Sequence, residues 1–293
     1  ADLQSAVRLN PRQHHAHVSL AMALQQTHHW REAIDELGEA IRIAGELVAA
    51  GELDAASLAP LHRNRAQTHL ERWQQRARLA AAGLIGAATA PPAMLTALMR
   101  LPPRDDEALA AARADLERAV EILQPSPDVA ARSKALVQLG QVHQLGDRHR
   151  EALDAFQRAL RATPNAPEPH RRRAQSLLKL GRYMAAEQGF TAYLELCRTS
   201  GAKPAGDVFL ARGLTRERLG RPAAAADDYT QSLALEPNGE NGQTLARRAR
   251  ALLAANRPHP ALLDFDEAVR LKSDSTEVLA GRAHARARLG RFE

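Results

Sequence analysis

The chain has 293 residues, of which 45% are hydrophobic but only 3% aromatic, so a large core is available and must be built mainly from Ala, Leu and Val. The formal net charge is +6 with a pI near 10.0, and the one cysteine, Cys197, excludes an intrachain disulfide and a multi-cysteine zinc site. Ala, Leu, Arg, Glu and Gln dominate, which favours helices, and no alternating run of β-branched residues indicates a strand.

The first elements along the chain are expected to be helices with one apolar side. Residues 1–11, with Leu3 and Ala6 before Pro11, have the pattern of a second hairpin helix that lacks its first. Residues 14–45 contain a complete helical pair, because apolar residues recur at helical spacing on both sides of a turn. The residues that carry this pattern are Leu20, Ala21, Leu24, Trp30, Ala33, Leu37 and Ala40.

The next hairpin, residues 59–124, is interrupted by an apolar insertion at residues 73–106. We expect its first helix to overrun toward Leu84 and to be followed by a Pro-Pro break and a short helix over residues 93–100. The insertion is interpreted as padding that buries itself against the side of the array. The alternative is a partner-docking or dimerising element, because large exposed apolar patches are rare on soluble proteins.

The remaining hairpins follow one another closely. Each has a small residue in its first helix, a Leu-Gly turn or its equivalent, and an Ala followed four residues later by an aromatic residue. The clearest copy carries Leu136, Leu139, Gly140, His143, Ala152, Phe156, Ala159 and Pro164. The predicted hairpins are residues 133–164, 167–197, 206–237 and 242–273, and residues 276–293 begin a first helix that lacks its second.

This pattern resembles the tetratricopeptide repeat, a helix–turn–helix unit of about 34 residues with the pattern W-x2-L-G-x2-Y…A-x3-F…P. The resemblance covers nearly the whole chain and implies an all-α fold, a right-handed α-solenoid of antiparallel helix–turn–helix hairpins. Residues 1–293 would then form a single array cut within a repeat at both ends, which indicates a piece of a longer protein. Arrays this rich in Arg and Ala are similar to those of large bacterial signalling proteins.

The resemblance also implies a function. In this family the first helices line a concave groove that binds proteins, and the arrays are not enzymes. The groove positions here lean basic, so we expect a peptide or partner protein that presents an acidic segment. They are Arg63, Gln67, Gln141, Gln144, Arg171, Gln175, Lys179, Leu214, Arg218, Arg250, His284 and Arg288.

An arginine recurs in the first helices directly before the small residue, at what we name the Arg position: Arg65, Arg173, Arg212, Arg248 and Arg282. The acid position directly precedes the aromatic residue or Leu of the second helix. A planar guanidinium suits a carboxylate at such a junction, so we expect structural pairs with nitrogen–oxygen distances within about 4 Å. The predicted pairs are Arg65–Asp115, Arg212–Asp228 and Arg248–Asp264, whereas Arg173 faces Gly189 and is left to meet another group.

Other functions stay open at this level. Arg-rich stretches such as residues 171–173 could contact nucleic-acid phosphates, although the scarcity of aromatic residues argues against stacking on single strands. The array could instead be the recruitment module of a larger signalling enzyme such as a Ser/Thr kinase. The apolar faces of the two half-hairpins also suggest end-to-end self-association.

Signals for catalysis, cofactors or membranes are weak. The sequence contains no GxxxxGK[ST], GxGxxG or HExxH motif, so we expect no cofactor. The histidines between residues 14 and 29 lack a carboxylate among them and extend too far along a helix for a metal site. Residues 79–99 are too weakly apolar and too broken to span a membrane, and a cytoplasmic location is expected.

Overall fold

The structure is a computed structural model that describes residues 2–86, 107–235, 241–271, 273 and 275–290, with side chains described outside residues 79–86. Regular structure in these ranges is helical, with no strand among them. The chain divides into two compact units, Ala1–Pro164 and Asn165–Glu293. No helix in the described ranges is both long enough and apolar enough to cross a bilayer.

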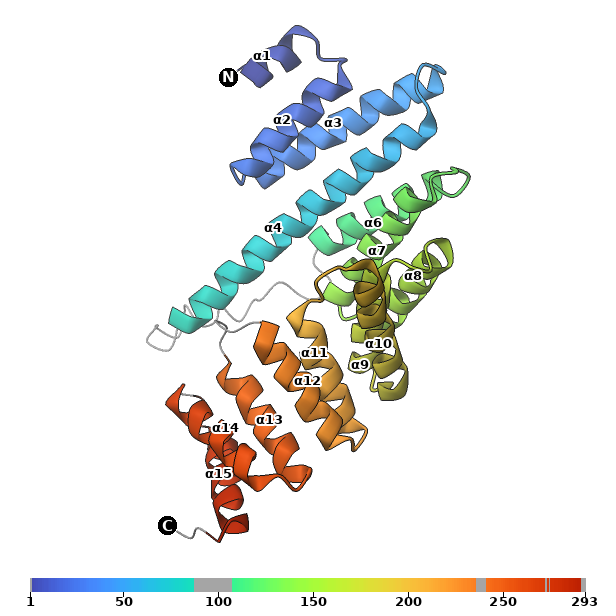
Figure 1. The fold of residues 1–293 in the computed structure, drawn as a ribbon. Helices are drawn as coiled ribbons and strands as arrows, with labels where there is room; N and C mark the ends of the chain where they lie inside the picture. The colour runs from blue at the N-terminus through green and yellow to red at the C-terminus, as the bar shows by residue number, and fades with distance from the viewer. Residues whose placement is uncertain (1, 87–106, 236–240, 272, 274, 291–293) are drawn as a thin grey trace. The chain divides into compact units, whose positions relative to one another are not determined.

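The first unit stacks antiparallel helical hairpins (Figure 1). Within it, α2 pairs with α3, α4 with α6, and α7 with α8. The helices are α1 (Asp2–Leu9), α2 (His14–Gln26), α3 (Trp30–Ala49), the short 3₁₀ helix η1 (Ala55–Ser57), α4 (Leu58–Gly86), α6 (Glu107–Ile122), α7 (Val129–Leu145) and α8 (His149–Ala162).

The second unit repeats the same arrangement. Here α9 pairs with α10, α11 with α12, and α13 with α14, while α15 packs against α14. The helices are α9 (Pro167–Lys179), α10 (Tyr183–Ser200), α11 (Gly206–Arg218), α12 (Pro222–Leu235), α13 (Gly242–Ala254), α14 (Pro258–Arg270) and α15 (Thr276–Arg288). The fold class expected from the sequence, an α-solenoid of helix–turn–helix hairpins, is confirmed.

Close contact between an aromatic ring and a glycine holds two of the hairpins together. Phe156 on α8 lies against Gly140 on α7 so tightly that a methyl group at Gly140 would overlap the ring. Tyr229 on α12 meets Gly213 on α11 in the same way, and both rings are fully buried. Burying side chains of this size removes much apolar surface from water, which compensates for the low number of aromatic residues.

In the described residues, the short turns that follow first helices contain a residue with positive φ. Glycine adopts this backbone at no steric cost, as at Gly181 (φ 72°) and Gly220 (φ 70°). Three other hairpins place polar residues there, namely His28 (φ 62°), Asp147 (φ 62°) and Asn256 (φ 60°). Asp and Asn tolerate this conformation better than other non-glycine residues, so the turns keep one geometry despite different sequences.

Two helices of the first unit are longer than the other helices described. α4 continues to Gly86, close to the overrun toward Leu84 that the sequence indicated. α3 continues to Ala49, beyond the end of the hairpin predicted at residues 14–45, and the backbone takes positive φ only at Gly51, after the helix has ended. The short helix expected over residues 93–100 lies outside the described residues.

The end of α3 offers a test of the backbone argument. Gly45 and Gly51 both leave open space where a Cβ would be added, but only Gly51 has positive φ (77°). We expect Gly51→Ala to lower the free energy of unfolding by about 1–2 kcal/mol through left-handed strain. Gly45→Ala should instead raise it by about 0.5–1 kcal/mol, because alanine favours a helix interior. Urea unfolding followed by circular dichroism measures both, and equal shifts would contradict the explanation.

Candidate functional site

Each predicted Arg–Asp pair is brought together across its hairpin. Arg212 Nη2 lies 2.7 Å from Asp228 Oδ1, and Arg248 Nη2 lies 2.7 Å from Asp264 Oδ1. In both pairs Nε also donates to the carboxylate, so the contact is bidentate. Arg65 and Asp115 make the same contact, with Nη2 2.6 Å from Oδ1. They lie 50 residues apart in the sequence, whereas the two residues of each other pair lie 16 apart.

The remaining guanidinium nitrogen reaches the preceding hairpin. Arg212 Nη1 donates to Thr191 Oγ1 at 3.3 Å, and Arg248 Nη1 donates to Thr230 Oγ1 at 3.2 Å. Thr230 stands two residues after the acid position of the hairpin before it, which Asp228 occupies. One arginine therefore joins the two helices of its own hairpin and also contacts the second helix of the preceding one.

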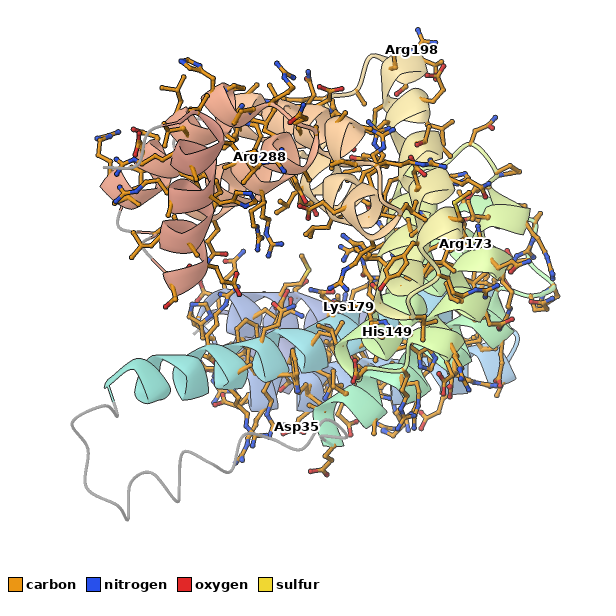
Figure 2. The ribbon with its side chains drawn as sticks, turned by 90° about the horizontal axis from the view of Figure 1, so that it is seen from below. Asp35, His149, Arg173, Lys179, Arg198 and Arg288 are labelled. Atoms are coloured by element: carbon orange, nitrogen blue, oxygen red, sulfur yellow. The ribbon has the colours of Figure 1, made fainter. Side chains whose placement is uncertain are left out.

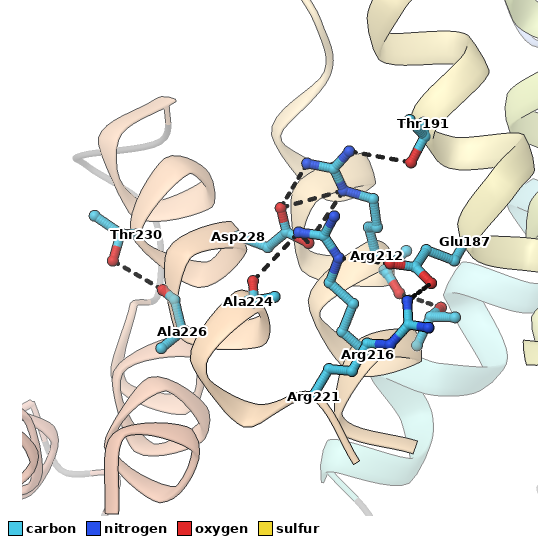
Figure 3. Close-up of polar contacts among 11 residues, drawn as sticks. Glu187, Thr191, Arg212, Arg216, Arg221, Ala224, Ala226, Asp228 and Thr230 are labelled. Carbon is cyan, nitrogen blue, oxygen red and sulfur yellow. Dashed lines mark hydrogen bonds and ion pairs between the residues drawn. The ribbon is translucent and has the colours of Figure 1, made fainter. Parts of the chain in front are cut away.

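Around Asp228 the pair grows into a network that connects α10, α11 and α12 (Figure 3). Asp228, only 2% exposed, also accepts a hydrogen bond from Arg216 Nη1 at 2.9 Å. Arg216 Nε in turn donates to Glu187 Oε1 at 2.9 Å, and Arg221 Nη1 donates to Glu187 Oε2 at 2.7 Å. Sequence reasoning missed Arg216 and Glu187, because their meeting depends on the packing of α10 against α11.

In the first unit, histidines also contact the carboxylates at two acid positions. His62 Nδ1 lies 2.9 Å from Asp115 Oδ1, and His17 Nδ1 lies 2.6 Å from Glu36 Oε2. His62 stands three residues before Arg65, and His17 stands three residues before Leu20, which takes the Arg position in α2. This shared spacing in the sequence would have allowed their prediction. Burial alone would raise the pKa of Asp115, but the hydrogen bonds from Arg65 and His62 outweigh it and hold that pKa below the ordinary value.

The hairpin of Arg173 differs from the others. Its acid position is Gly189, where an added Cβ would lie 2.9 Å from the Cβ of Ala174, so a side chain there would collide with α9. Arg173 is only partly exposed, and no hydrogen bond or ion pair joins it to another described residue. Figure 2 labels Arg173 together with Lys179, which lies further along α9.

Several of the predicted groove residues already bind side chains of the same unit. Arg171 pairs with Glu168 at 2.9 Å and with Asp207 on α11 at 3.0 Å. Hydrogen bonding to Glu168 raises the pKa of Arg171, so its charge is firmly held. Arg250 pairs with Glu277 on α15 at 3.2 Å. These two groove arginines already have carboxylate partners.

Further groove residues also make contacts within the chain. Arg63 donates to Gln138 at 2.7 Å, Gln67 to Glu71 at 3.0 Å, Gln175 to Asp207 at 3.5 Å and Arg288 to Asn256 at 2.9 Å. Leu214 packs against the hydrophobic core of the second unit. Gln141 and Gln144 on α7 have polar contacts of their own.

Other basic side chains of the first helices are exposed to solvent. Lys179 on α9 and Arg218 on α11 are exposed, and neither makes an ion pair with a described residue. His284 on α15 is exposed as well. Arg247, which was not among the predicted groove residues, is partly exposed on α13 and likewise makes no hydrogen bond with the described part of the chain.

Arg247 lines a cavity of about 240 Å³ between α13 and α15. The floor is apolar, with Ala246, Phe265 and Val278 all buried. The rim is polar and carries opposite charges, because Glu277 lies near the two arginines. The lining residues are Gln243, Ala246, Arg247, Arg250, Phe265, Ser273, Ser275, Glu277 and Val278.

A second hollow, of about 640 Å³, opens in the first unit beside the start of the insertion. Arginines and histidines share its lining with acidic residues, and Trp30 Nε1 donates to Gln75 Oε1 within it. Its lining residues are His28, His29, Trp30, Arg31, Glu32, Arg72, Gln75, Arg76 and Glu107. No group of three or more His, Cys, Asp or Glu side chains suited to a metal ion is found in the described ranges.

These stacked hairpins define an α-solenoid repeat protein, and comparison with known proteins gives the family. Residues 104–165 match the family model of the tetratricopeptide repeat, the family that the sequence pattern resembles. Residues 104–165 therefore carry a tetratricopeptide repeat, and the other hairpins of the chain share its helix–turn–helix arrangement. A search of curated protein sequences found no match.

Solved structures share the fold at low sequence identity. Cut9 in the APC/C hetero-tetramer Cut9-Hcn1 is 13% identical with a TM-score of 0.56, and the alignment covers 97% of this chain but 45% of that one. MamA (41-end) from Desulfovibrio magneticus RS-1 is 15% identical with a TM-score of 0.53, covering 74% and 97%. BtubC from P. vanneervenii is 15% identical with a TM-score of 0.52, covering 70% and 91%. Likeness at this level shows the fold alone.

The buried carboxylate at Asp228 can be tested against its neighbour in the sequence. Asp228→Ala would leave Arg212 and Arg216, whose side chains are 13% and 19% exposed, without their carboxylate. We expect it to lower the free energy of unfolding by about 3–5 kcal/mol. The matched control Asp227→Ala, at an exposed position, should change it by less than about 0.5 kcal/mol. Equal effects of the two changes in urea unfolding would contradict a structural role for the pair.

Asp115 predicts a pH dependence. Its pKa is lower in the folded state than the ordinary 3.8, so its charge stabilises the fold above that pH, and this contribution is lost as the pH falls through the folded pKa. The stability difference between wild type and Asp115→Asn should therefore be large at neutral pH and shrink in acid below 3.8. Urea titrations at both pH values measure the difference. A difference independent of pH would show that the carboxylate charge contributes nothing.

Proposed function

We propose that this chain is a binding scaffold that holds a peptide or partner protein against its first helices, with no reaction of its own. The proposal is supported by the tetratricopeptide fold, whose stacked hairpins leave the first helices of a unit available as a binding surface. The observation that carries it furthest is the cavity between α13 and α15, where Arg247, which pairs with no described residue, borders an apolar floor.

The chemistry of this cavity favours a segment with one carboxylate beside an apolar side chain. Arg247 can donate two hydrogen bonds to a carboxylate, and hydroxyls from Ser273 and Ser275 lie in the same lining. An apolar side chain of the partner would cover Ala246 and Val278. Glu277 would repel a second carboxylate at the rim, so the acidic character proposed for the partner is local rather than general.

Groove arginines that already bind a carboxylate are expected to contribute less to partner binding. A carboxylate approaching Arg171 would compete with Glu168 and Asp207, and one approaching Arg250 would compete with Glu277. Such competition lowers the net gain from a new ion pair, because the old contact must be given up. Arg247, Lys179 and Arg218 are therefore the cations proposed to contribute most to binding.

A peptide library tests this directly. The 293-residue chain is used to select ligands from random peptides, and binding of the enriched sequences is measured by fluorescence anisotropy. We expect the selected peptides to carry an Asp or Glu next to an apolar residue, and Arg247→Glu to weaken them at least about tenfold, as the loss of a charge-assisted bidentate contact implies. The control Arg198→Glu changes an exposed arginine at the end of α10 and should leave affinity unchanged (Figure 2).

Two outcomes would reject the proposal. Peptides without acidic enrichment, or equal loss of affinity in the two variants, would exclude recognition by Arg247. Tight binding of a labelled oligonucleotide, with an affinity that falls steeply as salt rises, would instead favour the nucleic-acid alternative.

A further inference from the structure

The overrun of α4, residues 72–86, forms one wall of the hollow in the first unit. In every other described first helix, the helix ends five residues after its small residue. The small residue of α4 is Ala66, so a helix of that length would end at Glu71. This wall therefore has no counterpart in the other hairpins. The lining residues that the overrun supplies share one face of α4 and are Arg72, Gln75 and Arg76.

The other wall comes from the turn between α2 and α3 and from the start of α3, which packs alongside α4 (Figure 1). Trp30 Nε1 donates a hydrogen bond to Gln75 Oε1, so the indole is held against the overrun. The ring centroid of Trp30 lies 5.2 Å from that of His28, with the two planes tilted by 50°. The two rings give an aromatic side to a hollow of about 640 Å³, a size that suits a small-molecule ligand.

Two arginines of this hollow make no hydrogen bond or ion pair with a described residue. They are Arg72, which is only partly exposed, and Arg31, which is exposed. Other partly exposed arginines, such as Arg65 and Arg212, are paired with a carboxylate. Removing a guanidinium from water without such a partner is unfavourable, and a bound anion would supply the partner that Arg72 lacks. Arg76, which has a polar contact of its own, adds a third positive charge to the lining.

Two acidic residues, Glu32 and Glu107, line the same hollow, and neither makes an ion pair with Arg31 or Arg72. They would repel a ligand that consists only of an anion. Their carboxylates accept hydrogen bonds, so they suit a ligand that also carries hydroxyl or amino groups. Several arginines around one ligand match the charge of phosphate better than that of a single carboxylate. The lining therefore suits a ligand that combines phosphate, a planar ring and hydroxyl groups.

We propose that this hollow binds a nucleoside diphosphate. Its phosphates would accept hydrogen bonds from Arg31 and Arg72, and its base would stack on Trp30. The ribose hydroxyls would donate to Glu32 or Glu107. Stacking is tolerant of the base, so the proposal concerns the class of ligand and not one nucleotide. The site lies within the first unit and is separate from the peptide cavity between α13 and α15.

Isothermal titration calorimetry of the 293-residue chain with adenosine diphosphate (ADP), without divalent cations, tests the proposal. We expect one ADP to bind per chain, and adenosine and inorganic pyrophosphate each to bind more weakly, because each makes only part of the contacts. Arg72→Gln and Trp30→Leu should each weaken ADP binding at least about tenfold, through the loss of a bidentate contact or of stacking. The control Arg78→Gln changes an exposed arginine of α4 outside the lining and should bind ADP like wild type.

A further variant guards against a change in the fold. Arg31→Gln alters an exposed side chain, so it should weaken ADP binding while the helical circular dichroism spectrum stays that of wild type. A wild-type chain that binds no ADP would overturn the proposal, as would unchanged affinity in Arg72→Gln. Pyrophosphate that binds as tightly as ADP would exclude the aromatic side from recognition and overturn it too.

Two other outcomes would place the ligand elsewhere or change its class. Loss of ADP binding in Arg247→Glu would move the site to the cavity of the second unit. A single-stranded oligonucleotide that displaces ADP and binds more tightly would identify a nucleic-acid strand as the ligand. Either result would overturn the proposal of a nucleoside diphosphate site.

Discussion

A bidentate contact between an arginine of the first helix and a buried aspartate of the second sets the geometry of the hairpins that contain it. Removing two charges from water is costly, and the pair alone is weak evidence of stability. Its effect is on register, because any other alignment of the helices would leave Asp228 or Asp264 buried without a partner. Since the same guanidinium also reaches the preceding hairpin, one side chain orders the helices within a repeat and between repeats.

The hairpins without this pair solve the same packing problem by other means. Where the Arg position is Leu139, the acid position is Ala155, and both side chains are buried in one apolar cluster. Where the acid position is Gly189, the helices approach until Ala174 fills the space. Glu36 faces a leucine at the Arg position and is held by His17 instead. Apart from the hairpins of Gly189 and Glu36, the two positions therefore vary together, either both polar and paired or both apolar.

The sequence predicted the hairpins because their determinants are local. Small and aromatic residues recur at helical spacing, and the Arg and acid positions keep one separation in complete hairpins, so even the pair across the insertion was recognisable. The pairing of groove arginines with carboxylates was not predicted. Asp207 lies 36 residues after Arg171, whereas Glu277 lies 27 residues after Arg250, so the acids that occupy the groove arginines follow no repeat spacing. Such contacts depend on how neighbouring first helices pack and not on the pattern of either helix.

This distribution of charge bears on what the first helices can recognise. The chain has an excess of positive charge, yet many arginines of the described residues are bound to carboxylates of the same unit. A phosphate backbone is best met by a continuous row of free cations, since affinity grows with the number of phosphates neutralised. Lys179, Arg218 and Arg247 instead stand on three different helices, each among neutralised neighbours. Separate cations beside apolar surface suit a partner that places a few carboxylates at defined positions, as a folded protein or a peptide does.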